Sequence, residues 1–388
     1  MAKHFDKLSA RNDNAKKAIA LHKKLQGKIR VMPAAPVRNR KELALVYTPG
    51  VAAVSMLVAN NNKLARDYTI KGRMVAVISD GSAVLGLGNI GALGALPVME
   101  GKCALFKTFA DVDAVPLVLD TQDTEKIIEA VLAVAPAFGG INLEDIAAPK
   151  CFEIEKRIID ALDIPVMHDD QHGTAIVVLA ALLNALKVVK KKLESAKIVI
   201  SGAGAAGSAV AELLHAAGAR HMLVLDRKGI IAKTRTDLSA HKAILASYTN
   251  HGDLTGDLKT ALHEADVLIG VSGPGLARAS DIAGMAEGAI VFALANPTPE
   301  IMPDEAIAGG AVVVGTGRSD FPNQINNSLA FPGVFRGALD NHVTKITTDM
   351  KIKAAHAIAR LVPKPTAKRI VPDMFDKRVA RAVAKVIR

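Results

Sequence analysis

The stretch that decides the fold is KIVISGAGAAGSAVAELLHAAGARHMLVLD, residues 197–226. An aliphatic strand pattern runs through Gly202-x-Gly204-x-x-Gly207 into an amphipathic helical pattern, and a second strand pattern ends at Asp226. In such a frame the first glycine makes a tight turn, the second lets the backbone approach a pyrophosphate, and the third lets the helix pack on the strand. The closing acid accepts hydrogen bonds from ribose hydroxyls. The stretch therefore predicts a Rossmann unit that binds NAD or NADP through Gly202, Gly204, Gly207 and Asp226.

A second glycine stretch has the same spacing but a different setting. It reads VLGLGNIGALGALPVMEGK, residues 84–102, with Gly86-x-Gly88-x-x-Gly91 inside it. No acid-ended strand follows one helix later, and we expect Pro97 to interrupt the helix that these glycines would begin. Two interpretations stay open: the loop brings backbone close to a ligand in an interdomain cleft, or it is a tight turn packed under a sheet.

The rest of the chain alternates strand and helix patterns on both sides of this unit. Aliphatic strands ending in acids alternate with helical patterns before residue 166, and the alternation restarts more regularly from Ala196. We therefore predict an α/β protein of two domains. Residues 1–165 form an N-terminal catalytic α/β domain, and residues 166–388 form a Rossmann-type, doubly wound parallel sheet with C-terminal helices. A long helical pattern from His172 to about Lys192 begins the second domain or bridges the two.

Composition and charge exclude several other classes of protein. Half of the 388 residues are hydrophobic and Trp is absent, so the cores must be aliphatic. Two cysteines, Cys103 and Cys151, predict reduced thiols in a cytoplasmic protein rather than a disulfide framework. The longest apolar run, Ala175–Val189, is too short to span a bilayer, and no signal peptide is evident.

The formal net charge of +11 comes from the two ends of the chain. Residues 1–40 hold 11 Lys/Arg against 2 Asp/Glu, residues 341–388 hold 12 against 3, and the part between them is net acidic. Because aromatic residues are not interleaved with these cations, we expect solvated helix faces or subunit contacts rather than a nucleic-acid surface.

Two pairs of acids, Glu144-Asp145 and Asp169-Asp170, each follow an aliphatic strand. The carboxyl edge of a parallel sheet is where α/β enzymes bind their ligands, and adjacent buried carboxylates repel one another unless a cation lies between them. Carboxylate oxygens favour Mg²⁺ or Mn²⁺ over zinc. Helix capping explains either pair alone, but both pairs together in a dinucleotide enzyme favour a metal. His168 and His172 are interpreted as ordinary hydrogen-bonding residues and not as ligands.

At this point the chain resembles a family. Eight motifs stand in the order seen in short bacterial malic enzymes and cover nearly the whole chain: YTPGVA, DGSAVLGLGNIG, PVMEGKCALFK, NLEDIAAPKCF, HDDQHGTA, GAGAAG, FALANPTPE and NNSLAFPGVFRGAL. The resemblance implies oxidative decarboxylation of malate to pyruvate and CO₂, reduction of NAD or NADP, a requirement for Mg²⁺ or Mn²⁺, and a homodimer.

The resemblance also implies the roles of particular residues. The family's general acid falls on Tyr47 and its general base on Lys102, whose pKa we expect to be depressed by a nearby cation and an apolar wall. The metal ligands fall on Glu144, Asp145 and Asp170, with Asp169 as a neighbouring carboxylate. The remaining assignments are Asn296 and Asn327 for malate or the nicotinamide, and Thr174 for the cofactor pocket.

One departure and several alternatives remain. Larger malic enzymes carry a substrate-binding arginine where this chain has Ser82 and Ala83, so the malate carboxylate must be held by another, unassigned residue. Asp226 favours NAD, but Arg227 and Lys228 follow it and suit the 2′-phosphate of NADP. Malolactic conversion of malate to lactate uses much the same site. More distant alternatives are an amino-acid dehydrogenase and a dinucleotide-sensing regulator without turnover.

Overall fold

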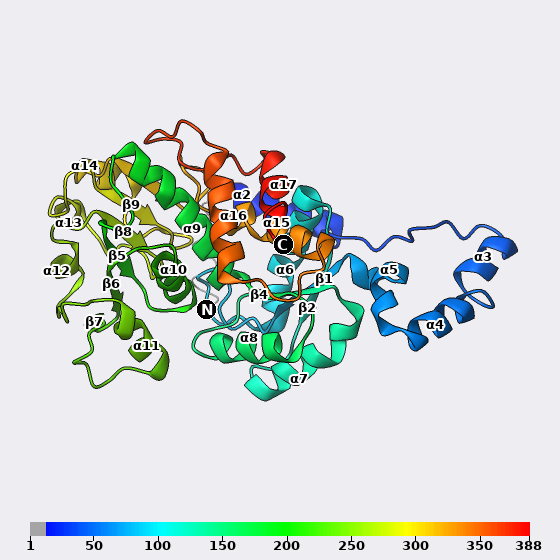
Figure 1. Ribbon diagram of the computed structural model, residues 1–388. Helices are drawn as coiled ribbons and strands as arrows, with labels where there is room; N and C mark the ends of the chain where they lie inside the picture. Colours follow the sequence, from blue (N-terminus) through cyan, green and yellow to red (C-terminus); the bar gives the residue numbers. More distant parts are fainter. Residues whose placement is uncertain (1–12) are drawn as a thin grey trace.

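The computed structural model describes residues 13–388 and contains two β-sheets, each flanked by helices (Figure 1). This confirms the predicted α/β class. The N-terminal sheet has four parallel strands in the order β2-β1-β3-β4. Its strands are β1 (Met74–Ser79), β2 (Asp113–Val118), β3 (Gly140–Leu143) and β4 (Val166–His168). The helices of this region are α6 (Gly91–Ala110), α7 (Thr124–Val134), η3 (Ala135–Ala137) and α8 (Lys150–Ala161).

The second sheet has six strands in the order β10-β9-β8-β5-β6-β7, parallel except for β7. The chain begins at the central strand and winds outward in both directions, as in a Rossmann fold. Its strands are β5 (Lys197–Ser201), β6 (His221–Asp226), β7 (Gly229–Ile230), β8 (Val267–Gly270), β9 (Ile290–Ala293) and β10 (Val313–Thr316). Its helices are α10 (Ala205–Ala216), α11 (Ala240–Tyr248), α12 (Leu258–Leu262), α13 (Ala279–Ile282) and α14 (Pro303–Ala308).

A long buried helix and the C-terminal helices join the two sheets. Helix α9 (Asp169–Val188) is buried along most of its length and packs against α10 and α16. Helix α15 returns to the N-terminal region, where Phe331 and Phe335 meet Phe106 edge-on at 4.7 and 5.5 Å between ring centroids. The C-terminal elements are η4 (Asn327–Leu329), α15 (Phe331–Asp340), α16 (Thr348–Arg360) and α17 (Arg378–Ala384).

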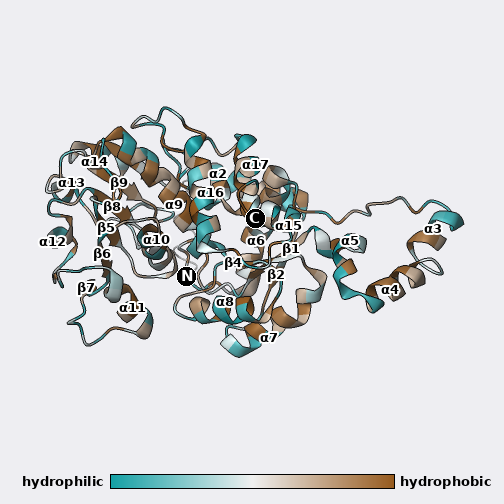
Figure 2. Cartoon of the chain, viewed as in Figure 1, coloured by the Kyte–Doolittle hydropathy of each residue, from teal (hydrophilic) through white to brown (hydrophobic). Residues whose placement is uncertain are grey.

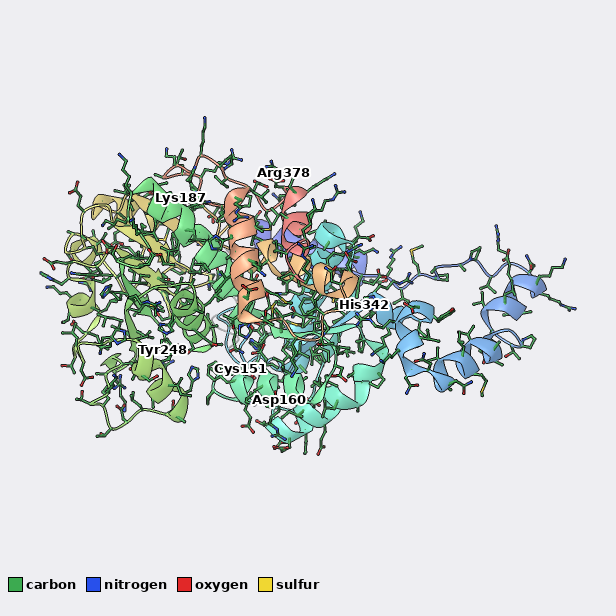
Figure 3. The ribbon with its side chains drawn as sticks, in the orientation of Figure 1. Cys151, Asp160, Lys187, Tyr248, His342 and Arg378 are labelled. Atoms are coloured by element: carbon green, nitrogen blue, oxygen red, sulfur yellow. The ribbon has the colours of Figure 1, made fainter. Side chains whose placement is uncertain are left out.

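The division expected between residues 165 and 166 remains a prediction. Strand β4 begins at Val166 and pairs with β3, so it completes the N-terminal sheet before α9 begins at Asp169. Both free cysteines are buried, as expected, and Cys151, in the first turn of α8, is labelled in Figure 3.

The expectation that Pro97 interrupts a helix was wrong. Helix α6 runs without a break from Gly91 to Ala110 with Pro97 inside it. The proline removes one backbone donor, but one face of the helix is anchored in the core by Met99, Cys103 and Phe106. Packing of this face outweighs the lost hydrogen bond, and it places Lys102 in the interior.

Between α2 and β1 the chain leaves the body as an arm (Figure 1). Two of its helices, α3 and α4, form as expected on either side of the Thr48-Pro49-Gly50 turn, and no residue of either helix is buried by residues 13–388. Much of α4 is hydrophobic nonetheless (Figure 2). The elements before β1 are α2 (Asp13–Leu25), α3 (Arg40–Val46), α4 (Val51–Asn60), η1 (Asn62–Leu64), α5 (Ala65–Tyr68) and η2 (Ile70–Gly72).

Within the described residues, two segments are long and apolar enough to cross a bilayer, Arg40–Asn60 and Asp169–Val188. Most of the second is buried in the protein as α9, and the first is divided between α3 and α4. Length and composition alone are weak evidence for a membrane span in such segments, because core helices satisfy the same criteria.

Candidate active site

The carboxylates selected from the sequence meet at one edge of the N-terminal sheet. Glu144 and Asp145 follow β3, Asp170 stands in the first turn of α9 after β4, and ligand atoms of these three residues lie within 4.8 Å of one another. The backbone N–H of Asp145 donates to Asp170 Oδ2 at 2.8 Å, which ties the two loops together. Asp145 Oδ2 is buried and has no hydrogen-bond partner within residues 13–388. A buried carboxylate oxygen without a partner is costly, and a hard cation is a suitable partner.

Lys102 of α6 lies among these acids. Its ammonium donates to Glu144 Oε1 at 2.8 Å and to Asp169 Oδ2, and it stands 4.0 Å from the centroid of the Phe331 ring. The side chains of Lys102, Glu144 and Asp169 are all at most 7% exposed. The site therefore has a buried amine with both an acidic and an aromatic neighbour.

The electrostatics of the cluster bear on the expectation for Lys102. Burial alone would lower the pKa of this lysine, but the charges of Asp169 and Glu144 outweigh burial and raise it. Burial is also the largest influence on the four carboxyl groups, and it raises the pKa of Glu144, Asp145, Asp169 and Asp170. The expected depression of the Lys102 pKa depends on a bound cation and stays a prediction, and the anions around the lysine act in the opposite direction.

A buried acid that the sequence analysis missed anchors the loop carrying Asp169 and Asp170. Glu155 on α8 accepts hydrogen bonds from the backbone N–H of His168 at 2.7 Å, from Gln171 at 2.9 Å and from His172 Nε2 at 3.1 Å. Lys351 of α16 contacts the other ring nitrogen of His172 at 2.9 Å. The only signal in the sequence was an acid on the apolar face of a helix.

Of Asn296 and Asn327, the two asparagines assigned to malate or the nicotinamide, Asn327 lies beside the acids. A Cβ built on Gly173 would be 1.8 Å from Asp169 Oδ1 and 3.2 Å from Asn327 Cβ, so glycine is needed for this close approach. Thr174, the next residue of α9, is half-buried.

Asn296 follows β9 and meets the first glycine loop. A Cβ on Gly86 would lie 2.1 Å from the Asn296 carbonyl oxygen, and one on Gly317 would lie 2.9 Å from its side-chain nitrogen. The first glycine stretch therefore packs closely against the backbone that follows β9, and its approach to a ligand stays a prediction.

The second glycine loop has the geometry expected of a pyrophosphate cradle. Gly202 has a φ of +121°, and a Cβ on Gly207 would be 1.8 Å from the Gly202 carbonyl oxygen. No atom lies within 4 Å of a Cβ built on Gly204, so the backbone there faces open space at the N-terminus of α10. Asp226 ends β6 beside this loop, and its carboxylate is occupied by Arg235 and Lys242.

Comparison with known proteins agrees with this geometry. A family model described as the malic enzyme N-terminal domain matches residues 26–159, and one described as the malic enzyme NAD binding domain matches residues 171–388. The chain belongs to the malic enzyme family.

Individual relatives match it over most of their length. The bifunctional malic/malolactic enzyme of Bacillus subtilis is 53% identical over 373 residues, covering 95% of this chain and 91% of that protein. The NADP-dependent malic enzyme of Halomonas elongata is 48% identical over 370 residues, covering 94% of this chain and 86% of that protein. The crystal structure of the NAD-dependent malic enzyme from Thermotoga maritima has a TM-score of 0.93 at 49% identity, covering 95% of this chain and 98% of that one.

One residue of the malic enzyme pattern stands apart from the others. Tyr47 ends α3 on the arm, with 66% of its surface exposed, while Lys102 is buried in α6 within the body (Figure 1). The structure thus brings together the acids, Lys102 and Asn327 in one protomer but leaves Tyr47 outside that site.

The segment that lacks the arginine of larger malic enzymes has a structural role here. Ser82 donates to Asp80 at 2.6 Å and accepts from the backbone N–H of Ala147 at 2.9 Å, and the Ala83 N–H donates to the Asp145 carbonyl oxygen at 2.9 Å. These bonds hold the acid loop in place, and the segment offers no cation to a substrate carboxylate.

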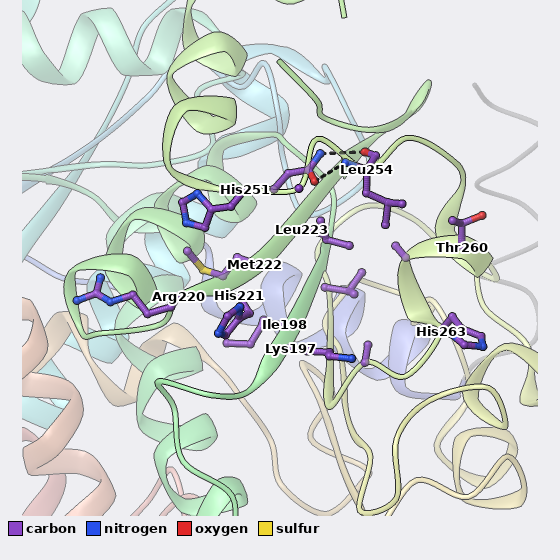
Figure 4. Close-up of a pocket in the computed structure, with 15 residues that line it drawn as sticks. Lys197, Ile198, Arg220, His221, Met222, Leu223, His251, Leu254, Thr260 and His263 are labelled. Carbon is purple, nitrogen blue, oxygen red and sulfur yellow. Dashed lines mark hydrogen bonds between the residues drawn. The ribbon is translucent and has the colours of Figure 1, made fainter. Parts of the chain in front are cut away.

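A cavity of about 310 Å³ lies away from this malic enzyme site. It opens at the beginning of β5 and β6, the opposite edge from the Gly202 loop, and its lining includes Lys197, Arg220 and His263. Figure 4 shows Arg220 and His263 at opposite ends of the opening, so these side chains do not converge on one point.

Proposed function

We propose that this protein catalyses the divalent-metal-dependent oxidative decarboxylation of malate to pyruvate and CO₂, with reduction of NAD or NADP, in the cytoplasm. The observation that carries the proposal is the buried Lys102 amine among Glu144, Asp145 and Asp169, with Asp170 closing the cluster and Asn327 beside it. Membership of the malic enzyme family supports the same reaction.

We assign the base to Lys102. It is the one amine within hydrogen-bond distance of both Glu144 and Asp169 in the described chain, so it stands among the proposed metal ligands. In its neutral form, which a bound cation favours by offsetting the charges of these carboxylates, its Nζ takes the proton of the C2 hydroxyl while the hydride leaves C2. The bound nicotinamide cofactor supplies the hydride acceptor. The amide of Asn327 and the backbone around Gly86 limit the space between the domains and orient malate there.

We assign the metal to Glu144, Asp145 and Asp170. Three oxygen donors within 4.8 Å, one of them a buried oxygen without a partner, suit Mg²⁺ or Mn²⁺. When bound, the cation supplies positive charge that stabilises the oxyanion developing at C2 and offsets the carboxylates that raise the pKa of Lys102.

We assign reprotonation of the enolate at C3 to Tyr47 of a second copy of the chain. The arm that carries Tyr47 exposes Leu45 (77%) and Met56 (61%), and near the site the body exposes Leu93 (82%) at the start of α6. These apolar surfaces of the arm and the body do not meet within one chain. In a symmetric dimer the arm of each chain can cover the apolar surface on the body of the other. In the proposed homodimer each arm reaches across to the partner's Lys102 site.

The direct test is turnover with L-malate, Mn²⁺ and either NAD or NADP, followed by the absorbance of the reduced cofactor and by product analysis. Pyruvate, CO₂ and reduced cofactor in equal amounts support the proposal, and strict dependence on the divalent metal supports the assignment of the acids. Absence of cofactor reduction by metal-loaded, folded protein would contradict it.

One comparison favours a second candidate, the conversion of malate to lactate. The relative from Bacillus subtilis is named a bifunctional malic/malolactic enzyme. In that reaction the hydride returns to the keto carbon of pyruvate before the cofactor leaves. Lactate as the main product, with no net reduced cofactor, would therefore favour the malolactic alternative.

A further inference from the structure

We propose that this chain selects NADP over NAD, that Lys242 recognises the 2′-phosphate of the adenosine ribose, and that Arg235 occupies the Asp226 carboxylate that NAD would need. The inference rests on the proposed dinucleotide-dependent function and specifies its cofactor. It reverses the simplest interpretation of Asp226, which by its position alone favours NAD.

Asp226 stands where a ribose would be bound. Leu225 pairs with Ser201 in the parallel register of β5 and β6, and the Gly202 N–H donates to the Leu225 carbonyl oxygen at 3.0 Å. The carboxylate that ends β6 is therefore next to the first glycine of the pyrophosphate loop.

The hydrogen-bonding capacity of this carboxylate is already used within the protein. Oδ1 accepts from Arg235 at 2.8 Å and from the backbone N–H of Lys228 at 2.9 Å. Oδ2 accepts from Arg235 at 3.1 Å and from Lys242 Nζ at 2.5 Å. A carboxylate offers about four lone-pair positions, and all four have a donor here. The two ribose hydroxyls of NAD find no free acceptor on Asp226.

The groups around Asp226 carry an excess of positive charge. Two of its donors, Arg235 and Lys242, are full cations, and the exposed Arg227 follows it directly in the chain. The second nearby acid, Asp237, is paired with Arg235 at 2.9 Å and with Lys228 at 2.8 Å. The surroundings of Asp226 thus contain four cationic side chains and two carboxylates: Arg227, Lys228, Arg235 and Lys242 against Asp226 and Asp237. A phosphate monoester, with a charge near −2 and three acceptor oxygens, complements this excess, and a hydroxyl does not.

The geometry also gives Asp226 a purpose that does not involve the ribose. Its bidentate pair with Arg235, together with the bonds from Arg235 to Asp237, fixes the guanidinium with 14% of the side chain exposed. Lys242 of α11 is more accessible, at 30%. The remaining N–H of Arg235 points to the carbonyl oxygens of Gly229 and Ile230, so all five of its donors have acceptors within the protein. The Lys242 ammonium has three N–H groups and is bonded to Asp226, so it is the group with donors left for a phosphate.

Two fragments of the cofactors separate this inference from the proposed function: adenosine 2′,5′-bisphosphate and 5′-AMP, which differ only in the 2′-phosphate. By calorimetric titration of the full-length native protein, we expect the bisphosphate to bind at least about tenfold more tightly, the increment of one charge-assisted hydrogen bond. Lys242→Ala should remove about tenfold of that preference, because it removes a phosphate donor and frees one acceptor position of Asp226 for the ribose hydroxyl of 5′-AMP. Arg235→Gln is the second variant, and Lys259→Ala on α12 is the control for loss of one exposed lysine of the same domain.

The kinetic measurement is the ratio of kcat/KM for NADP to that for NAD. The ratio should exceed unity in the native protein, fall in Lys242→Ala and Arg235→Gln, and stay at the native value in Lys259→Ala. If 5′-AMP binds as well as the bisphosphate, or if Lys242→Ala and Arg235→Gln both keep the native ratio, the inference is overturned while the dinucleotide function stands. If neither fragment nor either cofactor binds the folded protein, the proposed function itself is overturned.

Discussion

The sharing of one active site between two protomers can be tested with two inactive variants. Lys102→Ala removes the buried amine, and Tyr47→Phe keeps the ring but removes the phenolic hydroxyl. A positioned acid or base contributes roughly 10²–10⁴-fold to a rate, so each variant alone should retain about 1% of native turnover or less. In the proposed dimer Lys102 comes from one chain and Tyr47 from the other, because Tyr47 is 66% exposed on an arm that leaves the body.

Co-expression of the two variants with different affinity tags allows mixed dimers to form. A mixed dimer has one site in which both residues are native and one in which both are lost. With random pairing half of the dimers are mixed, so the preparation should recover about one quarter of native activity from parents that have almost none. Dimers purified through both tags in succession should have about half the native activity.

The reciprocal mixture supplies the matched control. The native chain co-expressed with a Lys102→Ala/Tyr47→Phe double variant forms mixed dimers in which every site lacks one of the two residues. Activity should then fall to about one quarter, whereas sites built within one chain would keep about one half. If doubly tagged dimers form but the single variants do not complement each other, the exchanged arm is refuted, and Tyr47 either acts within its own chain or has no catalytic role.

Three further outcomes follow from the site. Asp170→Asn removes one of three charged ligands and should weaken Mn²⁺ binding by about tenfold or more while cofactor binding persists; unchanged metal affinity in a titration would remove Asp170 from the ligand set. Gly204→Val should abolish cofactor binding in a folded protein, and Gly88→Val should slow turnover but preserve binary cofactor binding; the opposite pattern would exchange the roles of the two glycine loops. Burial opposes ionisation of Glu155, but His172 and His168 bring its pKa down to about 2, below the ordinary value of 4.5, so its contribution to stability is complete above pH 4.5 and is lost as the pH falls toward 2. Urea unfolding between pH 2.5 and 7 should show a slope up to about 1.4 kcal/mol per pH unit from this group that Glu155→Gln lacks, and identical profiles for the two proteins would contradict the assignment.

Local patterns were sufficient to predict most of the fold. The strands around the two acid pairs and the five parallel strands from Lys197 onward form where aliphatic runs indicated them, because buried parallel strands have a simple hydrophobic signature. The helix through Pro97 was mispredicted, since the local cost of proline is visible in the sequence and the packing of Met99 and Phe106 that offsets it is not. Propensity is a weak prior wherever tertiary contacts act on the same residues.

In the candidate site, too, the sequence indicated positions along strands but not the tertiary contacts of single side chains. The acids were recognised because they follow strands, and parallel strands end at one edge. Glu155 was missed, because its three donors come from residues 13 to 17 positions later and nothing local marks their meeting. Asp226 was expected at the end of a strand and lies at the end of β6, but it was interpreted as a free acceptor. Its partners Arg235 and Lys242 lie beyond β7 and in α11, so no local pattern indicated these contacts.

The two glycine stretches are distinguished by how they follow their strands. Gly202 follows β5 directly, whereas residues 80–85 separate β1 from Gly86. The first glycine of each stretch lies close to backbone, Gly86 to the Asn296 carbonyl oxygen and Gly202 to that of Val271, and the middle glycines Gly88 and Gly204 both face open space. The loop of the first stretch exposes Leu85 and Leu87, at 53% and 51%, close to where α6 leads to Lys102. Both stretches lie in a parallel β-α-β unit, because β2 follows α6 and pairs with β1 just as β6 follows α10 and pairs with β5. The resemblance of the first stretch to a dinucleotide fingerprint therefore extends to its unit, and the longer segment between strand and glycines is what sets it apart.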